Sequence, residues 1–405
     1  MTSLKGRRVL LGVTGSIAAY KAAEWVRSLV KEEAIVTVVM TRAAERFVAP
    51  LTFSALSGNQ VYRDMFADES ERVMAHINLS READVILVAP ATAQTIARLA
   101  SGLADDLLST VILAGRIPVV FCPAMNSNML AHPATQENIR RLQRFGYHLV
   151  QPDSGYLACG EIGDGRLPEW DVAREALLAR FAVDDLSGLK VLITAGPTRE
   201  PLDPVRFLSN RSSGKMGFAL ARTARRRGAE VTLITGPVSL ADPPGIEVLR
   251  VNTAAEMAEL VMLRAGAAQV VVKSAAVADF RPTACQPHKI KKSNQGLHLD
   301  LEKNLDILKQ LGAHRQVGQL LVGFAAESRD HAGEGLRKLE EKNLDLIVVN
   351  DILGTQTGFD VETNQVTLID RKGNTVLPLL SKEATANRIW DKVVSLQCGR
   401  NGDTG

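Results

Sequence analysis

Cysteine is scarce in this chain of 405 residues, and the few that occur exclude two kinds of scaffold. Cys122, Cys159, Cys285 and Cys398 include no C-x-x-C pair, so the sequence shows neither a disulfide framework nor the usual ligand spacing of a zinc site. We therefore expect reduced thiols in a cytoplasmic protein.

Long apolar runs are lacking as well. The longest stretch free of Asp, Glu, Lys and Arg is 117–136, and its three prolines and its polar residues exclude a bilayer helix. An apolar segment over 9–19 follows three basic residues, as in a secretory signal. Glycines and hydroxyl residues within 12–16 interrupt it, which favours a strand followed by a loop. We expect no membrane partner.

The remaining composition is that of a globular protein, with 46% hydrophobic and 23% charged residues and enough length for two or more cores. The net charge of +3 is divided unevenly. Residues 1–185 carry 19 basic and 21 acidic side chains, whereas residues 186–405 carry 29 and 24. A mildly basic second half favours a small anionic ligand over a nucleic-acid groove, so we expect no nucleic-acid partner.

Short β-branched runs alternate with amphipathic stretches, and this pattern occurs twice along the chain. The first series predicts strands over 8–13, 35–40, 84–89 and 119–122, with helices such as 17–31 and 136–144. The second predicts strands over 190–195, 230–235, 270–274 and 346–350, with helices over 214–227 and 253–265. Apolar strands separated by helices indicate a parallel sheet covered on both faces. We therefore expect an α/β protein with two doubly wound, Rossmann-like domains, residues 1–185 and 186–398, and a disordered tail over 399–405.

A small-residue loop, GVTGSIAAYK over 12–21, follows the first predicted strand. Its backbone N–H groups, its hydroxyls at Thr14 and Ser16, and the start of the next helix suit a phosphate. It matches neither G-x-G-x-x-G nor the P-loop pattern, so a dinucleotide or a triphosphate is not indicated. Because such turns also serve tight packing, the loop alone leaves both roles open.

Four further segments give the first half a family resemblance. They are His76, the APAT strand end (Ala89–Thr92), PAMN with a later Met (Pro123–Met129), and ACGEIG (Ala158–Gly163). A lone histidine or a methionine pair is usually structural, but the combination resembles the flavin-containing cysteine decarboxylases, in particular those acting on phosphopantothenoylcysteine. The resemblance implies a homo-oligomer with FMN as cofactor.

The resemblance also implies the site residues of the first half. The FMN-binding positions are Gly15, Ser16, Ile17, Thr41, Ala89, Pro90, Ala91 and Thr92. His76 is the catalytic histidine, Asn126 holds the substrate carboxylate, and Cys159 is the thiol of a flap. Flavin oxidation of the substrate thiol supplies an electron sink for loss of CO2, and a mobile thiol can then donate a proton. Asp105 departs from the family, which usually has an amide there.

The second half contains a polar loop that leads into a predicted helix. Arg206, Asn210, Arg211, Ser212 and Lys215 converge on this helix start and favour an anion site, with a solvated loop as the alternative. The Ser-Ser-Gly-Lys sequence lacks the upstream glycine of a P-loop. Lysines at 289, 291 and 292 lie on a later loop. A lysine run is usually a solvated face, but on a loop it can neutralise a polyphosphate.

The second half resembles the bacterial phosphopantothenate–cysteine ligases. The motifs are ITAGPTREPLDPVRFLSNRSSGKMG (193–217), AAVADF (275–280), KIKK (289–292), GFAAE (323–327) and KNLDLIVVND (342–351). The resemblance implies CTP with Mg2+, whose protein ligands are not identified, an acyl-cytidylate intermediate, and release of CMP by the cysteine amine. The implied nucleotide-binding residues are Ser274, Ala275, Asp279, Lys289, Leu305, Asp306, Ile307, Leu308, Phe324, Lys338 and Lys342. Arg206, Asn210 and Ala276 are the implied substrate contacts, with Asn210 and Lys289 catalytic.

Together the two halves resemble the bifunctional enzymes of coenzyme A biosynthesis. We expect 4′-phosphopantothenate, L-cysteine and CTP as substrates and 4′-phosphopantetheine as product. The resemblance implies a homo-oligomer in which decarboxylase trimers and ligase dimers could combine into a dodecamer. Two alternatives for the first half are an FMN-dependent prenyltransferase of the same fold and a regulatory binding module without turnover. The presence of both His76 and Cys159 favours the decarboxylase.

Overall fold

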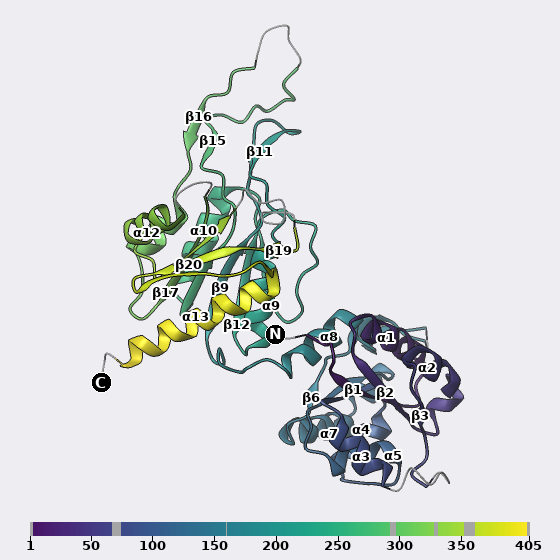
Figure 1. Ribbon diagram of the computed structural model, residues 1–405. Coiled ribbons are helices and arrows are strands. Elements are labelled where there is room, and N and C mark those ends of the chain that lie inside the picture. The colour runs from purple at the N-terminus through teal and green to yellow at the C-terminus, as the bar shows by residue number, and fades with distance from the viewer. Residues whose placement is uncertain are drawn as a thin grey trace. The chain divides into compact units, whose positions relative to one another are not determined.

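The computed structural model of the chain describes residues 3–66, 74–158, 160–291, 297–327, 331–351 and 361–402. The chain forms two compact units, one over Thr2–Ala182 and one from Val183 onward (Figure 1). Within the described ranges, no helix has the length and apolar character needed to cross a membrane.

The N-terminal unit is built on a six-stranded parallel sheet of order β3-β2-β1-β4-β5-β6. Its elements are β1 (Arg8–Val13), α1 (Ala19–Lys31), β2 (Ile35–Met40), the 3-10 helix η1 (Ala44–Arg46), α2 (Pro50–Ser57), β3 (Val61–Tyr62), α3 (Ala75–Glu82), β4 (Val85–Ala91), α4 (Ala93–Ala100), α5 (Leu107–Ala114), β5 (Val119–Pro123), α6 (Ser127–Ala131), α7 (Pro133–Arg144), β6 (His148–Leu149), β7 (Asp153–Tyr156), β8 (Ile162–Arg166) and α8 (Trp170–Ala179). The β7–β8 pair is a separate antiparallel hairpin.

Both faces of this sheet are buried, as its apolar strands predict. Val9, Leu11 and Val13 of β1 belong to one core, and Leu10 belongs to the core on the opposite face. Because side chains alternate along a strand, a continuous apolar run fills two cores at once. The polar groups of the unit are thereby left to the strand ends and the loops.

The C-terminal unit has an eight-stranded sheet of order β13-β12-β9-β14-β17-β18-β20-β21. Its elements are β9 (Lys190–Ala195), β10 (Arg199–Pro201), β11 (Phe207–Ser209), α9 (Lys215–Arg226), β12 (Glu230–Thr235), β13 (Glu247–Arg250), α10 (Ala254–Ala265), β14 (Val270–Lys273), β15 (Phe280–Pro282), β16 (Leu301–Lys303), α11 (Ile307–Ala313), β17 (Leu320–Glu327), α12 (His331–Glu341), β18 (Leu346–Asp351), β19 (Thr363–Asn364), β20 (Val366–Asp370), β21 (Gly373–Val376), β22 (Leu380–Ser381) and α13 (Lys382–Gly402).

The predicted doubly wound fold is confirmed in both units. The first six strands of the C-terminal sheet are parallel, and residues of α9 and α13 fill one core while residues of α10, α11 and α12 fill the other. The sequence did not predict the edge, where β20 and β21 add in antiparallel fashion to β18. Two antiparallel arms, β10–β11 and β15–β16, extend from the sheet (Figure 1).

The prediction of a disordered tail is wrong over residues 399–402, because α13 continues to Gly402. Residues 403–405 lie outside the described ranges. The helix is held near its end by Arg400, whose guanidinium donates to the carbonyl of Gln319 at 3.0 Å and pairs with the buried carboxylate of Asp345. The tail prediction missed this long-range contact because it considered only local composition.

Trp390 joins α13 to α9. Its ring is fully buried, and its indole N–H donates to the carbonyl of Leu220 at 3.1 Å and to the hydroxyl of Thr223 at 3.0 Å. An apolar helix face with a satisfied polar atom at its centre fixes how the helix packs.

We predict that Trp390→Ala destabilises the C-terminal unit by about 3–5 kcal/mol, since it removes a buried ring and leaves a cavity. Urea unfolding of the full chain, followed by circular dichroism, should show this as an earlier transition. The exposed Ser395→Ala on the same helix should change the stability by less than about 0.5 kcal/mol. Equal stability of the two variants would show that Trp390 does not hold α13 in place.

Candidate active sites

A cavity of about 990 Å³ opens at the carboxyl edge of the N-terminal sheet. It is lined by Gly15, Ser16, Ile17, Thr41, Arg42, Ala43, Arg46, Phe47, Thr92, Ala93, Gln94, Thr95, Arg98, Asp105, Asp106, Ala124, Met125 and Met129. These residues follow β1, β2, β4 and β5, whose carboxyl ends meet at one edge because the strands are parallel. This is where ligands bind in open α/β sheets.

The loop after β1 forms a close-fitting cradle on one side of this cavity. A Cβ atom on Gly15 would lie 2.5 Å from the Cβ of Ala43, so only glycine fits between the two loops. The hydroxyl of Thr14 donates to the carbonyl of Pro90 at 2.6 Å and accepts from the N–H of Thr92 at 3.1 Å. These two hydrogen bonds fix the loop after β1 relative to the loop after β4.

The cradle also contains an unused polar atom. Thr41 lines the cavity, and its buried Oγ1 atom has no hydrogen-bond partner among the residues that the structure describes. Because an unpaired buried hydroxyl is costly, a polar ligand would satisfy it. The cavity therefore fits a ligand with an anionic or polar group at the cradle and an apolar part toward Met125 and Met129.

A charged group that the sequence did not predict lies in the same cavity. The guanidinium of Arg98 pairs with Asp105 and with Asp106, each at 2.6 Å. Asp106 also caps α5, where its carboxylate accepts from the N–H of Ser109 at 2.7 Å. Asp105, the residue that departs from the family pattern, thus compensates the charge of Arg98 at the cavity wall.

The structure brings some of the predicted flavin residues together and leaves others apart. Gly15, Ser16, Ile17, Thr41 and Thr92 line the cavity. Ala89, Pro90 and Ala91 do not; they are buried within β4 and support the loop that follows. The half-buried His76 lies on α3 and is not among the lining residues of the described chain. Cys159 lies outside the described residues.

Asn126 lies next to the cavity, at the start of α6, where its side-chain oxygen accepts from the N–H of Asn128 at 2.9 Å. The β7–β8 hairpin packs on this segment: the N–H of Met125 donates to the carbonyl of Gly165 at 3.0 Å. Gly165 has φ +130°, and a Cβ there would lie 2.1 Å from the carbonyl oxygen of Met125. Glycine is therefore required to anchor the hairpin.

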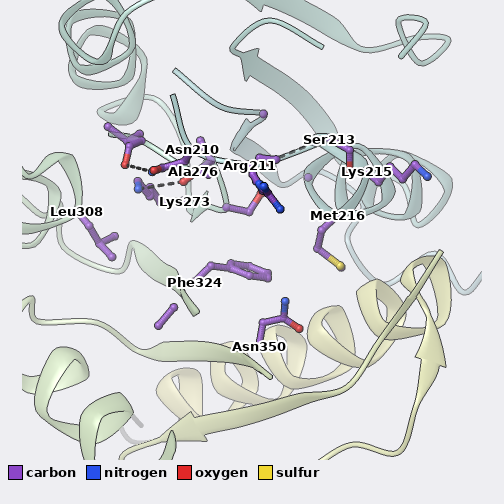
Figure 2. A pocket seen from close by; sticks show the side chains of 18 of the residues that line it. Asn210, Arg211, Ser213, Lys215, Met216, Lys273, Ala276, Leu308, Phe324 and Asn350 are labelled. Atoms are coloured by element: carbon purple, nitrogen blue, oxygen red, sulfur yellow. Dashed lines mark hydrogen bonds between the residues drawn. The ribbon is translucent and has the colours of Figure 1, made fainter. Parts of the chain in front are cut away.

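A second cavity, of about 460 Å³, opens at the carboxyl edge of the C-terminal sheet (Figure 2). It is lined by Gly196, Asn210, Arg211, Ser212, Ser213, Gly214, Lys215, Met216, Gly217, Lys273, Ser274, Ala275, Ala276, Val277, Asp279, Leu308, Phe324, Ala325, Lys338, Lys342, Ile347, Asn350, Asn364 and Lys382. Five lysines and one arginine face a single acid, Asp279, across this lining. The cavity is suited to a polyanion.

Two loops are fixed against each other at this cavity. The side-chain amide of Asn210 donates to the carbonyl of Val277 at 2.9 Å, so the loop before α9 is joined to the segment after β14. The hydroxyl of Ser274 donates to the carbonyl of Thr194 at 2.6 Å. The predicted substrate contacts Asn210 and Ala276 consequently lie on one wall (Figure 2).

Charged side chains lie close together at the residues that were predicted to bind the nucleotide. The ammonium of Lys342 lies 2.8 Å from the carboxylate of Asp306, which caps α11 by accepting from the N–H of Lys309 at 3.0 Å. Burial alone would raise the pKa of Asp306, but these hydrogen bonds hold it below its usual value. Burial, assisted by repulsion from Lys342, lowers the pKa of Lys273 to about 8.

Lys289 is exposed on the arm that leads from β15 toward β16, and it does not line the cavity in the described chain. The next residue, Ile290, is held on both sides. Its N–H donates to the carboxylate of Asp203 at 3.1 Å, and its carbonyl accepts from the guanidinium of Arg206 at 3.0 Å. The fully buried carboxylate of Asp203 also accepts from the N–H groups of Val205 and Arg206. Asp203 and Arg206 thus hold the backbone at Ile290, directly after Lys289.

Of the residues predicted to bind the nucleotide or the substrate in this unit, some line the cavity and others do not. Ser274, Ala275, Asp279, Leu308, Phe324, Lys338 and Lys342 line the cavity, as do Asn210 and Ala276. Leu305, Asp306, Ile307 and Arg206 lie outside the lining; Ile307 is buried and Leu305 is exposed. Lys273, Asn350, Asn364 and Lys382 also line the cavity and were not predicted from the sequence. A charged residue that ends a buried strand, as in VVVK over 270–273, was the available signal for Lys273.

Within the residues that the structure describes, no three His, Cys, Asp or Glu side chains are grouped so that they could hold a metal ion.

Comparison with known proteins identifies both units. The family model described as Flavoprotein matches residues 1–181, and that described as DNA/pantothenate metabolism flavoprotein C-terminal domain matches residues 186–396. The Coenzyme A biosynthesis bifunctional protein CoaBC of Bacillus subtilis (strain 168) is 47% identical over 97% of this chain and 98% of its own length. That of Escherichia coli (strain K12) is 45% identical over 97% and 98%.

The crystal structure of the C-terminal domain of a Coenzyme A biosynthesis bifunctional protein CoaBC is also similar, with 41% identity over 53% of this chain and 97% of that chain and a TM-score of 0.46. The near-complete coverage of the relatives includes both units. The chain therefore belongs to the CoaBC family of bifunctional coenzyme A biosynthesis enzymes, with an N-terminal flavoprotein decarboxylase domain and a C-terminal ligase domain.

Proposed function

We propose that the ligase domain joins L-cysteine to 4′-phosphopantothenate at the expense of CTP, and that the decarboxylase domain converts the product to 4′-phosphopantetheine with FMN. We assign these activities to residues 186–398 and 1–185. The observation that carries the proposal is the pair of cavities at the two sheet edges, one with a phosphate cradle and one with a cluster of cations. The place of action is the cytoplasm, in keeping with the scarcity of cysteine.

FMN suits the N-terminal cavity. Its single phosphate fits the cradle at Gly15 and Ser16, where Ile17 begins the approach to α1 and Thr41 offers its unpaired hydroxyl. Thr92 completes the site, and the buried Ala89, Pro90 and Ala91 support it. When bound, the flavin accepts and returns the electrons of the substrate thiol.

Three residues act on the substrate in the decarboxylase domain. Asn126 holds the carboxylate that leaves as CO2, from a segment anchored by the β7–β8 hairpin. His76 acts as the catalytic histidine. It is placed on α3, apart from the lining of the cavity, so a second copy of the chain is proposed to bring it to the site. Cys159 donates a proton after CO2 has left.

CTP suits the C-terminal cavity. Lys338 and Lys342 face its phosphates, Asp279 and Phe324 lie on the same lining, and the segment 305–308 contributes backbone groups. Mg2+ would enter bound to the triphosphate, because no cluster of acids in the described chain offers it a site. The cations stabilise the charge that develops on pyrophosphate as it leaves.

The ligation runs in two steps. The carboxylate of 4′-phosphopantothenate attacks the α-phosphorus of CTP, which gives an acyl-cytidylate and pyrophosphate. The amine of cysteine then attacks the acyl carbon and CMP leaves. We assign Asn210 and Ala276, on one wall of the cavity, to contacts with the acyl group. Lys289 acts on the charged intermediate, and Arg206 supports the arm that carries Lys289.

We propose that the protein is a homo-oligomer. The two arms of the ligase domain expose large apolar side chains, including Val205 at 59%, Phe207 at 47% and Phe280 at 46% of their full area. The decarboxylase domain exposes Ile17 at 59% beside the flavin cavity. Apolar groups at a site edge are commonly covered by a partner. Ligase dimers and decarboxylase trimers would combine into a dodecamer.

For the flavin site, we predict that the purified protein is yellow and that acid releases FMN, identified by its mass. Gly15→Val should abolish the colour, since its side chain would collide with Ala43 in the cradle. Gly266→Ala, where an added Cβ meets nothing within 4 Å, should keep it. A colourless wild-type protein that does not take up FMN would exclude this site.

For the decarboxylase, we predict that Cys159→Ser still releases CO2 but stops before the final reduction, because the proton donor is lost. Mass spectrometry should detect a product two hydrogen atoms lighter than 4′-phosphopantetheine. The exposed Cys285→Ser should give the normal product. Normal product at the normal rate from Cys159→Ser would contradict the assigned role.

For the ligase, we predict pyrophosphate release with phosphopantothenate and CTP in the presence of Mg2+, and much less with ATP. Lys289→Gln should slow pyrophosphate release, and Asn210→Asp should slow conversion of the acyl-cytidylate, each by at least about tenfold. The exposed Lys372→Gln should leave both steps unchanged. Unaltered rates in both site variants would remove these assignments.

A further inference from the structure

Lys273 lines the ligase cavity and has no role in the two-step reaction above. It ends β14, where its backbone pairs with Thr194 of β9 and Gly323 of β17. Its ammonium lines the cavity and donates to the carbonyl of Ala275 at 3.1 Å (Figure 2). It is thus held beside the backbone that leads directly to Ala276 and, through Val277, to Asn210.

The charged groups around Lys273 come from three other segments. Lys342 follows α12, Asp306 precedes α11, and Asp279 lies in the loop after β14; Lys338 of α12 lines the same cavity. Asp306 is already paired with Lys342 at 2.8 Å. Asp279 is exposed to solvent, and both acids act on the charge of Lys273 only as weaker, opposing causes of its pKa shift. Partial burial beside a second ammonium stabilises the charged form of a lysine poorly.

We propose that Lys273 is the base that deprotonates the amine of cysteine before it attacks the acyl-nucleotide. This inference rests on the proposed ligase function and adds a catalytic residue to its second step. The placement supports it, because the nitrogen of Lys273 lies on the wall that carries Ala276 and Asn210, where the acyl group is proposed to bind.

The protons and bonds of the step balance. The neutral amine of Lys273 takes one proton from the ammonium of cysteine, which leaves the cysteine nitrogen with a free electron pair. That nitrogen forms a bond to the acyl carbon, the bond from this carbon to the phosphate oxygen breaks, and the nucleoside monophosphate leaves with the electron pair. The second proton on nitrogen passes to solvent as the amide forms, and Lys273 later loses its proton to solvent.

The acid–base properties of Lys273 fit this task. With a pKa of about 8, roughly a quarter of the side chain is neutral at pH 7.5, against about one part in a thousand for an ordinary lysine. A base is most effective when its pKa is close to the working pH. Because the neutral amine is the active form, the rate of ligation should rise as the pH increases through about 8.

The test separates the two steps in the full chain. Lys273→Met removes the amine at similar length, and Lys273→Arg keeps a positive charge that does not lose its proton. Pyrophosphate release without cysteine reports the first step. Amide formation with cysteine at pH 7.5 reports the second. Hydroxylamine, whose nitrogen is already neutral at this pH, captures the acyl-nucleotide without needing a base.

We expect both variants to release pyrophosphate and to react with hydroxylamine within about twofold of the wild type. Ligation of cysteine should fall by about 10²-fold or more, and the rise of the rate through pH 8 should disappear. Lys309→Met, at an exposed lysine on α11, should leave both steps and the pH profile unchanged.

Other outcomes would overturn the proposal. Restoration of cysteine ligation by Lys273→Arg would show that only the charge matters. An equal loss of pyrophosphate release and cysteine ligation would assign Lys273 to nucleotide binding. If the wild-type protein released no pyrophosphate with any nucleoside triphosphate, the proposed ligase function would fail first, independently of Lys273.

Discussion

Burial of both faces of a parallel sheet is the constraint on which the rest of this protein depends. Val9, Leu10, Leu11 and Val13 of β1 fill two cores, so this strand has no solvent-facing side for polar side chains. The chemistry is confined to the carboxyl edge, where the strands stop and the loops diverge. Both cavities lie there, one in each unit.

Short side chains determine how closely the loops approach at these edges. Gly15 brings the first loop against Ala43, and Gly165 brings the β7–β8 hairpin against Met125. Thr14 then locks the first loop to Pro90 and Thr92 through two hydrogen bonds. These contacts create a rigid cradle before any ligand arrives, which reduces the entropy lost on binding.

The two cavities differ in the charged side chains that line them. In the decarboxylase domain Arg98 is compensated by Asp105 and Asp106, and Arg42 and Arg46 also line the cavity beside the cradle. In the ligase domain the lysines outnumber the acid of the lining, and burial lowers the pKa of one of them, Lys273, to about 8. A polyanion binds best where basic side chains predominate, whereas an amine nucleophile needs a neutral base. One lining can provide both because burial acts on each lysine separately.

The sequence by itself determined the two α/β units, the bounds of strands such as β1, β2, β9 and β12, and the loops that line the cavities. Apolar runs and small-residue turns are local features, and local features can be read along the chain. Only the tertiary structure decided that α13 extends past residue 398, that β20 and β21 close the sheet edge, and that Asp203 holds Ile290 from 87 positions away. It also decided that Lys273 is half-buried, with Lys342 repelling its charge, while Lys289 is exposed. The physical reason is that burial and charge pairing depend on residues that are distant in sequence, and no local pattern encodes the dielectric environment that folding creates around a side chain.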